Sequence, residues 1–184
     1  MYTAPTTTPT TTPTRTARAQ TVVDSPIGPL RLVAADGRLV GLYMDAQHHL
    51  PDTSGFGPRD DEAAPFVAVR RQLEEYFAGE RRVFDLPLGP EGTAFQQQVW
   101  EALRAIPYGQ TRTYGELAAA IGSPRAARAV GLANARNPIA VIVPCHRVVG
   151  ADGTLTGYAG GLRRKRLLLD LETAGSSTSS HAGR

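Results

Sequence analysis

The chain has 184 residues, of which 41% are hydrophobic and 20% are charged, so it is long enough for one medium domain or two small ones. No apolar run approaches the roughly 20 residues that a membrane-spanning helix needs, and the first residues lack the pattern of a secretion signal. The single cysteine, Cys145, excludes an internal disulfide. With only four histidines beside it, we expect no metal site.

The net charge of +3 hides an uneven distribution of charge along the chain. Residues 1–20 carry +2, residues 21–90 carry −4 from seven arginines and eleven acidic residues, and residues 91–172 carry +4. A polyanion such as nucleic acid is therefore expected to bind the second half. Ordinary scatter of charge is the alternative, because four charges are few.

The two ends of the chain differ in composition from the rest. Residues 1–20 are mainly Thr and Pro without a hydrophobic pattern, and residues 173–184 are rich in Ser, Thr, Ala and Gly. Such segments bury too little apolar surface to offset the entropy of ordering, so both are expected to be disordered.

Residues 21–90 have the pattern of a small α/β domain. Three short runs of β-forming residues are expected to be strands: 21–25, 30–36 and 38–44. Asp36-Gly37, between the last two runs, is a strong hairpin signal. In residues 64–78 the apolar side chains recur at helical spacing, and Gly79 is expected to end that helix. Residues 82–88 fit either an edge strand or an extended linker.

From Thr93 onward the pattern becomes helical. Four apolar residues form one stripe of a helix that is expected to end within residues 106–109: Phe95, Val99, Trp100 and Leu103. Two short helices are expected next, at 116–121 and 125–135, with Ser123 as the N-cap of the second. Helices joined this tightly form a helix-turn-helix candidate, and adjacent core helices are the alternative.

The second of these helices carries few bulky side chains. Small residues cover much of it: Ala126, Ala127, Ala129, Gly131, Ala133 and Ala135. A helix of this kind can lie close against another surface, such as the floor of a groove. Arg128 projects from its middle, where an arginine can pair with phosphate or enter a DNA stack. A solvated surface arginine is the alternative from the residues alone.

Residues 137–149 bring the only cysteine together with groups that can activate it. An apolar stretch leads to Pro144-Cys145-His146-Arg147 and then returns to two valines. A thiol with a pKa near 8.5 needs a base or a positive field to become the nucleophilic thiolate. Neighbours in sequence rarely point at each other, so His146 is expected to reach the sulfur through a water molecule or a bend. An unreactive buried cysteine is the alternative.

The chain resembles the O6-alkylguanine-DNA alkyltransferases. NPIAVIVPCHRVV carries the resemblance, together with GYAGGL and KRLLLDLE after it and FQQQVWEALRAIPYGQTRTYGELAAAIGSPRAARAVGLANARNP around the helix-turn-helix. The similarity is nearly continuous over residues 93–172 and looser over 21–90. It implies a small ribonuclease-H-like α/β N-terminal domain at 21–90, followed by a helical C-terminal domain with a winged helix-turn-helix at 91–172.

The resemblance also implies roles for individual residues. Cys145 would attack the alkyl carbon, His146 would act as the base, and Glu172 would orient the imidazole. Arg128 would replace the extruded nucleotide in the stack, and Tyr114 would crowd the neighbouring phosphate. Further DNA contacts would come from the helix-turn-helix: Thr113, Ser123, Arg125, Ala126, Ala127, Ala129 and Gly131. The base pocket and its hinge would comprise Asn137, Pro144, Arg147, Val148, Tyr158, Ala159 and Gly160.

The implied activity is the direct reversal of DNA damage. An alkyl group would pass irreversibly from O6-alkylguanine, mainly O6-methylguanine and also O4-methylthymine, to Cys145 after the base flips through the minor groove. Water cannot displace the thioether that forms, so each molecule would react once. No cofactor is expected, because the base supplies the alkyl group. The expected partner is double-stranded DNA with the lesion, and the expected state is a monomer in the bacterial cytoplasm or nucleoid, away from membranes.

Three other classes of protein compete with this interpretation. A non-catalytic alkyltransferase-like protein binds lesions without repairing them, but such proteins replace the nucleophile that Cys145 retains here. A cysteine hydrolase needs an oxyanion site and a distant histidine, and His48 and His49 stand in a polar loop. A transcriptional regulator needs base-reading side chains, of which the alanine-rich helix offers few.

Overall fold

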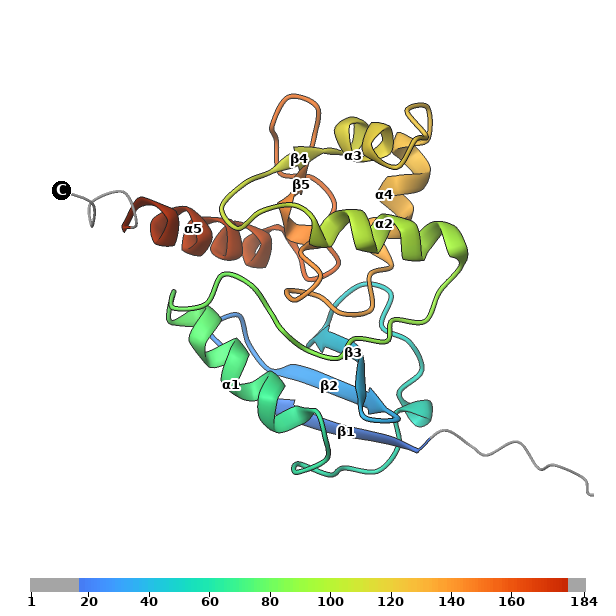
Figure 1. Ribbon diagram of the computed structural model, residues 1–184, viewed down its shortest axis with the longest axis vertical. Helices are drawn as coiled ribbons and strands as arrows, with labels where there is room; N and C mark the ends of the chain where they lie inside the picture. The colour runs from blue at the N-terminus through green and yellow to red at the C-terminus, as the bar shows by residue number, and fades with distance from the viewer. Residues whose placement is uncertain (1–16, 179–184) are drawn as a thin grey trace, which may run out of the picture.

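The computed structural model describes residues 17–178, which form two stacked units (Figure 1). The first contains strands β1 (Arg18–Val23), β2 (Leu30–Ala35) and β3 (Arg38–Met44), the short 3-10 helix η1 (Thr53–Phe56) and helix α1 (Phe66–Phe77). The second contains α2 (Ala94–Arg104), β4 (Arg112–Thr113), α3 (Tyr114–Ala120), α4 (Ala127–Ala135), η2 (Cys145–Arg147), β5 (Val148–Val149) and α5 (Leu162–Thr178). Within the described range, no helix is long and apolar enough to cross a membrane.

The three strands form an antiparallel sheet in the order β1-β2-β3. Asp36 and Gly37 have φ angles of 49° and 73°, as a two-residue turn with both central residues at positive φ requires, so the predicted hairpin is confirmed. Helix α1 packs on this sheet through a buried stripe that includes Phe66, Val69 and Leu73. Gly79, at φ 79°, follows its end.

The expected N-terminal disorder is wrong for the last residues of that segment. Strand β1 begins at Arg18, and Ala19 and Gln20 pair with Ala34 and Val33 of β2. The Gln20 side chain also donates to the Gly57 carbonyl at 2.7 Å. Backbone pairing therefore orders residues that lack a hydrophobic pattern of their own. Residues 1–16 lie outside the described part of the chain.

The outer edge of β3 is covered by two other segments of the chain. Leu39 exchanges backbone hydrogen bonds with Pro87 and Gly89 of the linker, which is otherwise extended and forms no strand. Leu42 bonds in the same way to Pro138 and Ala140 at 2.8 and 3.2 Å. The second contact belongs to the segment that leads to Cys145, so β3 supports the approach to the cysteine.

Helices α2 and α3 begin with side-chain caps, whereas α4 does not. Thr93 and Thr113 each form a reciprocal capping box, with Gln96 and Glu116 respectively. The expectation that Ser123 caps the next helix is wrong, because α4 starts at Ala127 without a side-chain cap. The Ser123 carbonyl instead accepts from the Ala126 amide at 2.8 Å, which closes a turn and delays the helix. Arg128 therefore lies in the first turn of α4.

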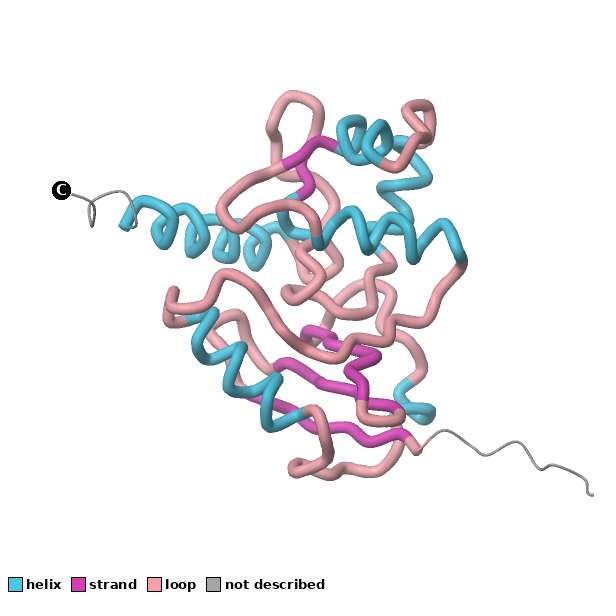
Figure 2. Tube along the Cα trace, viewed as in Figure 1, coloured by secondary structure: helices cyan, strands magenta, loops and turns pink. Residues whose placement is uncertain are grey.

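The expected C-terminal disorder is also wrong in part, because α5 continues through residues 173–178. Its last turns are held by Arg82, which donates to the Gly175 carbonyl at 2.7 Å, and by the Ser176 hydroxyl, which donates to the Glu172 carbonyl at 2.9 Å. Residues 179–184 lie outside the described range. Long loops join the remaining elements of the second unit (Figure 2), and one hydrophobic core runs through both units.

Candidate active site

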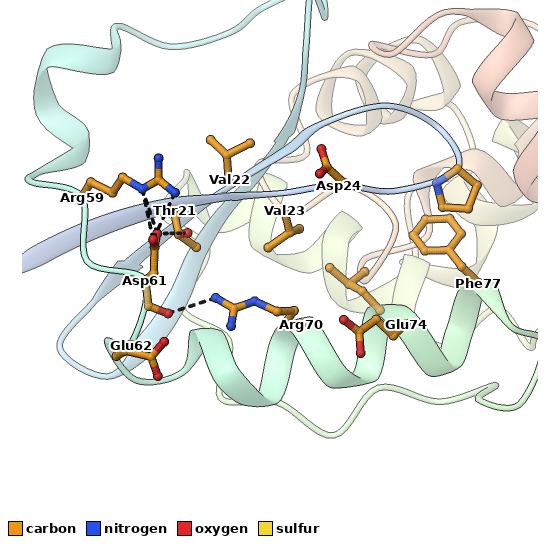
Figure 3. Close-up of a pocket in the computed structure, with 12 residues that line it drawn as sticks. Thr21, Val22, Val23, Asp24, Arg59, Asp61, Glu62, Arg70, Glu74 and Phe77 are labelled. Atoms are coloured by element: carbon orange, nitrogen blue, oxygen red, sulfur yellow. Dashed lines mark hydrogen bonds and ion pairs between the residues drawn. The ribbon is translucent and has the colours of Figure 1, made fainter.

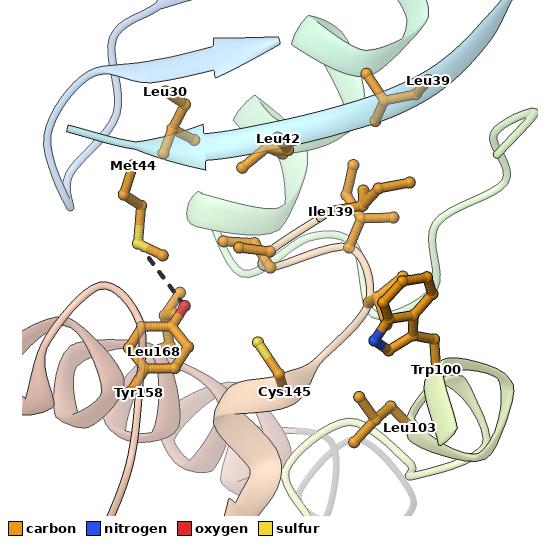
Figure 4. Packing of buried hydrophobic residues seen from close by; sticks show 14 of the residues in the cluster. Leu30, Leu39, Leu42, Met44, Trp100, Leu103, Ile139, Cys145, Tyr158 and Leu168 are labelled. Atoms are coloured by element: carbon orange, nitrogen blue, oxygen red, sulfur yellow. Dashed lines mark hydrogen bonds between the residues drawn. The ribbon is translucent and has the colours of Figure 1, made fainter. Parts of the chain in front are cut away.

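Cys145 lies at the centre of the molecule. Residues 139–143 pass beneath the sheet as a fully buried apolar segment, and η2 then presents the cysteine with a side chain that points into the core (Figure 4). Only 4% of Cys145 is exposed. The thiol is therefore shielded from bulk water in this conformation.

His146 and Glu172 form a buried pair next to this cysteine. Nε2 of His146 lies 2.8 Å from Oε1 of Glu172, and both side chains are fully buried. An ionised carboxylate only accepts hydrogen bonds, so Nε2 carries the proton that points to Glu172. Nδ1 of the neutral ring then has a lone pair, and it lacks a hydrogen-bond partner among the described residues. This nitrogen is free to accept a proton.

Glu172 receives four more donors besides the imidazole, from three residues. Arg147 approaches with Nε 2.9 Å from Oε2 and Nη2 2.9 Å from Oε1, the Gly109 amide lies 3.0 Å from Oε2, and the Tyr76 hydroxyl lies 2.7 Å from Oε1. Burial alone would raise the pKa of Glu172, but the hydrogen bonds and charges of His146 and Arg147 outweigh it and lower the pKa to about 2. The carboxylate is thus ionised at neutral pH.

Arg147 and Tyr76 have functions in this cluster that the sequence did not indicate. Arg147 was expected in the base pocket, but its guanidinium faces Glu172 and the Ile106 carbonyl. Tyr76 reaches Glu172 from α1, across 96 positions of sequence. Its helical spacing predicted only a core residue, because periodicity identifies buried positions and not their partners.

The cysteine itself has two polar neighbours. Burial raises the pKa of the Cys145 thiol to about 11, while a hydrogen bond from Asn137 and the positive charge of Lys165 oppose that rise. Lys165 is fully buried, and its Nζ donates to the carbonyls of Val148 and Thr156 at 2.5 and 2.6 Å. Burial lowers the pKa of this ammonium to about 8. The sequence marks Lys165 in one respect: it is the only lysine of the chain.

Tyr158 and Gly160, two of the residues expected to line the base pocket, lie against Met44. The hydroxyl of Tyr158 lies 3.8 Å from the sulfur of Met44, at the end of β3 (Figure 4). A Cβ on Gly160 would come within 2.4 Å of that same sulfur. The Ala159 carbonyl accepts from the His48 amide at 2.9 Å, and the Val148 carbonyl is bound by Lys165. Met44 is therefore a wall of this region that the sequence did not identify.

Two asparagines connect α4 to the cysteine. Asn137 donates to the Val143 carbonyl at 2.7 Å and accepts from the Ile139 amide at 3.0 Å, so it fixes the bend before Pro144. Asn134 is 2% exposed and lies with Nδ2 3.5 Å from the Cys145 carbonyl, and its Oδ1 lacks a partner in the described structure. A shift of the end of α4 would therefore move the backbone that holds Cys145.

The outer surface of α4 carries the residues expected to meet DNA. Arg125, Arg128 and Ala129 are exposed, and Ala126, Ala127 and Gly131 are half-buried. A Cβ on Gly131 would lie 3.7 Å from the ring of Tyr114, whose hydroxyl rests 3.5 and 3.4 Å from the carbonyls of Thr156 and Gly157. Thr113 and Ser123 lie in the backbone turns that begin α3 and precede α4. The structure thus joins the helix-turn-helix to the loop after Cys145.

A separate groove of about 510 Å³ lies between β1 and α1 (Figure 3). Four of its polar residues pair with one another: Asp61 accepts from Thr21 and Arg59, and Arg70 donates to the Asp61 carbonyl. None of its lining residues is a cysteine or histidine. The cluster around Cys145 is therefore the candidate site, although it is closed.

Comparison with known proteins identifies both units. Residues 19–90 match the family model of the 6-O-methylguanine DNA methyltransferase ribonuclease-like domain, and residues 94–174 match that of the DNA binding domain. The chain is 55% identical over 150 residues to the methylated-DNA–protein-cysteine methyltransferase of Mycobacterium tuberculosis, covering 82% of this chain and 89% of that protein. A constitutive Bacillus subtilis methyltransferase is 44% identical over 154 residues, covering 83% and 93%. The crystal structure of M. tuberculosis OGT in complex with DNA aligns with a TM-score of 0.78 at 52% identity, covering 86% and 94%.

Proposed function

The chain belongs to the 6-O-methylguanine DNA methyltransferase family, and we propose how its residues carry out the reaction of that family. The protein repairs DNA by transferring the alkyl group of O6-alkylguanine to one of its own cysteines. Cys145 is the acceptor, because the chain has no other cysteine. The observation that carries this assignment is the buried Cys145, next to the His146–Glu172 pair and Lys165.

The transfer exchanges one bond for another. Sγ of Cys145 attacks the alkyl carbon and forms a carbon–sulfur bond, while the bond from that carbon to guanine O6 breaks. The electron pair of the broken bond stays on guanine, which becomes the leaving group. The thiol proton passes to Nδ1 of His146 through a bridging water and is returned to guanine, so the products are a thioether and unmodified guanine. A thioether has no leaving group for water to displace, so one molecule repairs one lesion.

The helix-turn-helix supplies the DNA contacts in this proposal. The small residues on α4 suit the minor groove, which is about 6 Å wide, and Arg128 fills the stack when the base leaves it. Tyr114 presses on the adjacent phosphate, with Thr113, Ser123 and Arg125 on the backbone. Tyr158, Ala159, Gly160 and Val148 receive the base.

Access to the cysteine requires the loop after η2 to shift. Cys145 and Tyr158 are only 4% and 7% exposed, so a flipped guanine reaches the sulfur only when the residues that cover it move. The hydroxyl of Tyr114 rests on the Thr156 and Gly157 carbonyls at hydrogen-bond limits, which makes this contact the weak point of the loop. DNA that engages Tyr114 would therefore release the loop.

Two organisational features complete the proposal. The unit at residues 21–90 supports the site, and the unit at 91–172 binds DNA and accepts the alkyl group. The protein acts as a monomer in the bacterial cytoplasm, where chromosomal DNA is accessible to it.

The decisive experiment uses duplex DNA that carries one radiolabelled O6-methylguanine. We expect the label to move to the protein with one-to-one stoichiometry, and the Cys145→Ala variant to take up none. Several turnovers per molecule would contradict the single-use reaction. Binding to the lesion without transfer would identify a non-catalytic lesion-binding protein instead.

A further inference from the structure

We propose that Tyr76 is a positioning residue for alkyl transfer: its hydroxyl competes with His146 for Glu172 and thereby keeps Nδ1 of the imidazole free to receive the thiol proton. Tyr76 belongs to α1, in the unit that supports the site; it is fully buried, and its hydroxyl donates to Glu172. This inference rests on the function proposed above and concerns the proton acceptor of the same reaction.

The competition follows from the number of donors around the carboxylate. Oε1 receives Tyr76, His146 and Arg147 Nη2, and Oε2 receives Arg147 Nε and the Gly109 amide. A carboxylate offers about four lone-pair directions, so five donors exceed what it can satisfy well. Because Tyr76 and His146 share Oε1, each weakens the other's hydrogen bond.

The identity of the competing donor matters for the imidazole. A buried carboxylate next to histidine favours the protonated ring, and a protonated ring cannot accept the thiol proton. A phenol donor spreads the negative charge of Glu172 without adding a positive charge. The Tyr76 hydroxyl therefore weakens the pull of Glu172 on the imidazole proton, while the carboxylate stays ionised.

Several other groups shift the pKa of His146. Burial lowers its pKa, Glu172 on α5 opposes that shift, and Arg147 on η2 and Lys165 on α5 lower the pKa further. Cys145 precedes it in η2, and Tyr76 and Tyr108 face the same carboxylate from α1 and from the loop after α2. Replacing Tyr76 alone leaves Arg147 and Lys165 in place, so the change measures the effect of the phenol hydroxyl on His146.

The packing around the Tyr76 ring holds its hydroxyl against Glu172. The side chain is fully buried, with Phe84 at a ring-centroid distance of 5.3 Å and Tyr108 edge-on at 6.1 Å. Burial and the nearby Glu172 raise the pKa of Tyr76, so the hydroxyl retains its proton throughout the working range. It can only donate to the carboxylate.

The test compares Tyr76→Phe with wild type, using Tyr108→Phe as the matched control. Tyr108 belongs to the same ring cluster, but its hydroxyl lies 3.4 Å from the Leu171 carbonyl and does not bond to Glu172. The titration of His146 is followed by nitrogen-15 NMR of the imidazole, which needs no alkyl transfer. Single-turnover transfer from free O6-benzylguanine is then measured against pH.

We expect Tyr76→Phe to raise the midpoint of the His146 titration by about 0.4–1 pH unit, the equivalent of one net hydrogen bond. The acid limb of the rate profile should move by the same amount, so transfer slows below neutral pH and recovers above it. Tyr108→Phe should leave the titration midpoint unchanged. If Tyr76→Phe unfolds the protein, 3-fluorotyrosine at position 76, a stronger donor, should lower the midpoint.

An unchanged His146 titration in Tyr76→Phe, or a rate loss that is equal at every pH, would overturn the proposal and leave Tyr76 a packing residue. A wild-type protein that fails to transfer the alkyl group would refute the proposed function instead. The NMR titration would still decide the role of Tyr76.

Discussion

Lys165 shows how one side chain can influence the nucleophile without contacting the substrate. It is the only lysine of the chain, and its charge lies close enough to Cys145 to oppose the effect of burial on the thiol. An ammonium can lose its proton when buried, whereas a guanidinium stays charged. The choice of lysine therefore makes the positive field near the sulfur dependent on pH near 8.

Replacing Lys165 by Met should slow transfer from free O6-benzylguanine about tenfold or more, since a rise of one unit in the thiol pKa reduces the thiolate tenfold. Lys165→Arg keeps the charge and should retain more of the rate, although its fork fits the Val148 and Thr156 carbonyls less well. Single-turnover rates at pH 7 measure both. Equal losses in the two variants would show that the hydrogen bonds to the loop matter and the charge does not.

At the scale of elements, α4 connects the DNA surface to the cysteine. Its first turn exposes Arg128, and its end is tied to α2 by Trp100, which donates to the Ala133 carbonyl at 2.9 Å. Asn134 and Asn137 then link the end of α4 to the backbone around Cys145. One short helix thus carries the exposed Arg128 at its start and is linked at its end to the backbone around Cys145.

Arg128→Ala is expected to slow repair of O6-methylguanine in duplex DNA about tenfold or more, because flipping a base costs a few kcal/mol that the inserted side chain offsets. Reaction with free O6-benzylguanine should change little. Arg125→Ala, three residues earlier in the turn, is the control: it should weaken DNA affinity and its salt dependence while sparing the rate at saturating DNA. Equal losses on duplex and free base in Arg128→Ala would exclude a role in flipping.

At the scale of the whole molecule, the buried hydrogen bonds and charges around Glu172 connect the two units. Glu172 of α5 binds donors from α1, η2 and the loop after α2. Its pKa in the folded state, about 2, lies below the ordinary value of 4.5, so this carboxylate stabilises the fold above pH 4.5 and stops doing so as the pH falls toward 2. His146 acts in the same direction, because its lowered pKa favours unfolding once the pH falls below 6.5.

Acid should therefore unfold wild type more steeply than Glu172→Gln. The pH-dependent part of the stability difference should be about 3 kcal/mol at pH 7 and should vanish between pH 4.5 and 2. Urea denaturation at a series of pH values measures it. Glu101→Gln, which changes an exposed partner of Arg104, should follow wild type at every pH. A difference between Glu172→Gln and wild type that stays constant with pH would contradict this account.

The sequence predicted local structure better than it predicted partners. Runs of β-forming residues and the Asp36-Gly37 turn depend on neighbours in the chain, and the structure confirms them. The Ser123 cap failed because a backbone turn used the same residues.

Contacts between distant segments needed the structure. The hydroxyl of Tyr76 and the sulfur of Met44 meet residues 96 and 114 positions away, which no periodicity encodes. The cysteine and its histidine were recognisable because they are adjacent and belong to a specific motif.

The covered edge of β3 has a consequence for the order of synthesis. The ribosome releases β3 long before residues 138–140, the segment that completes its edge at Leu42. At about 5–20 residues per second, that edge waits on the order of 5–20 s, exposed to strands of other nascent chains. The first unit is therefore most prone to aggregation while the second is still being translated.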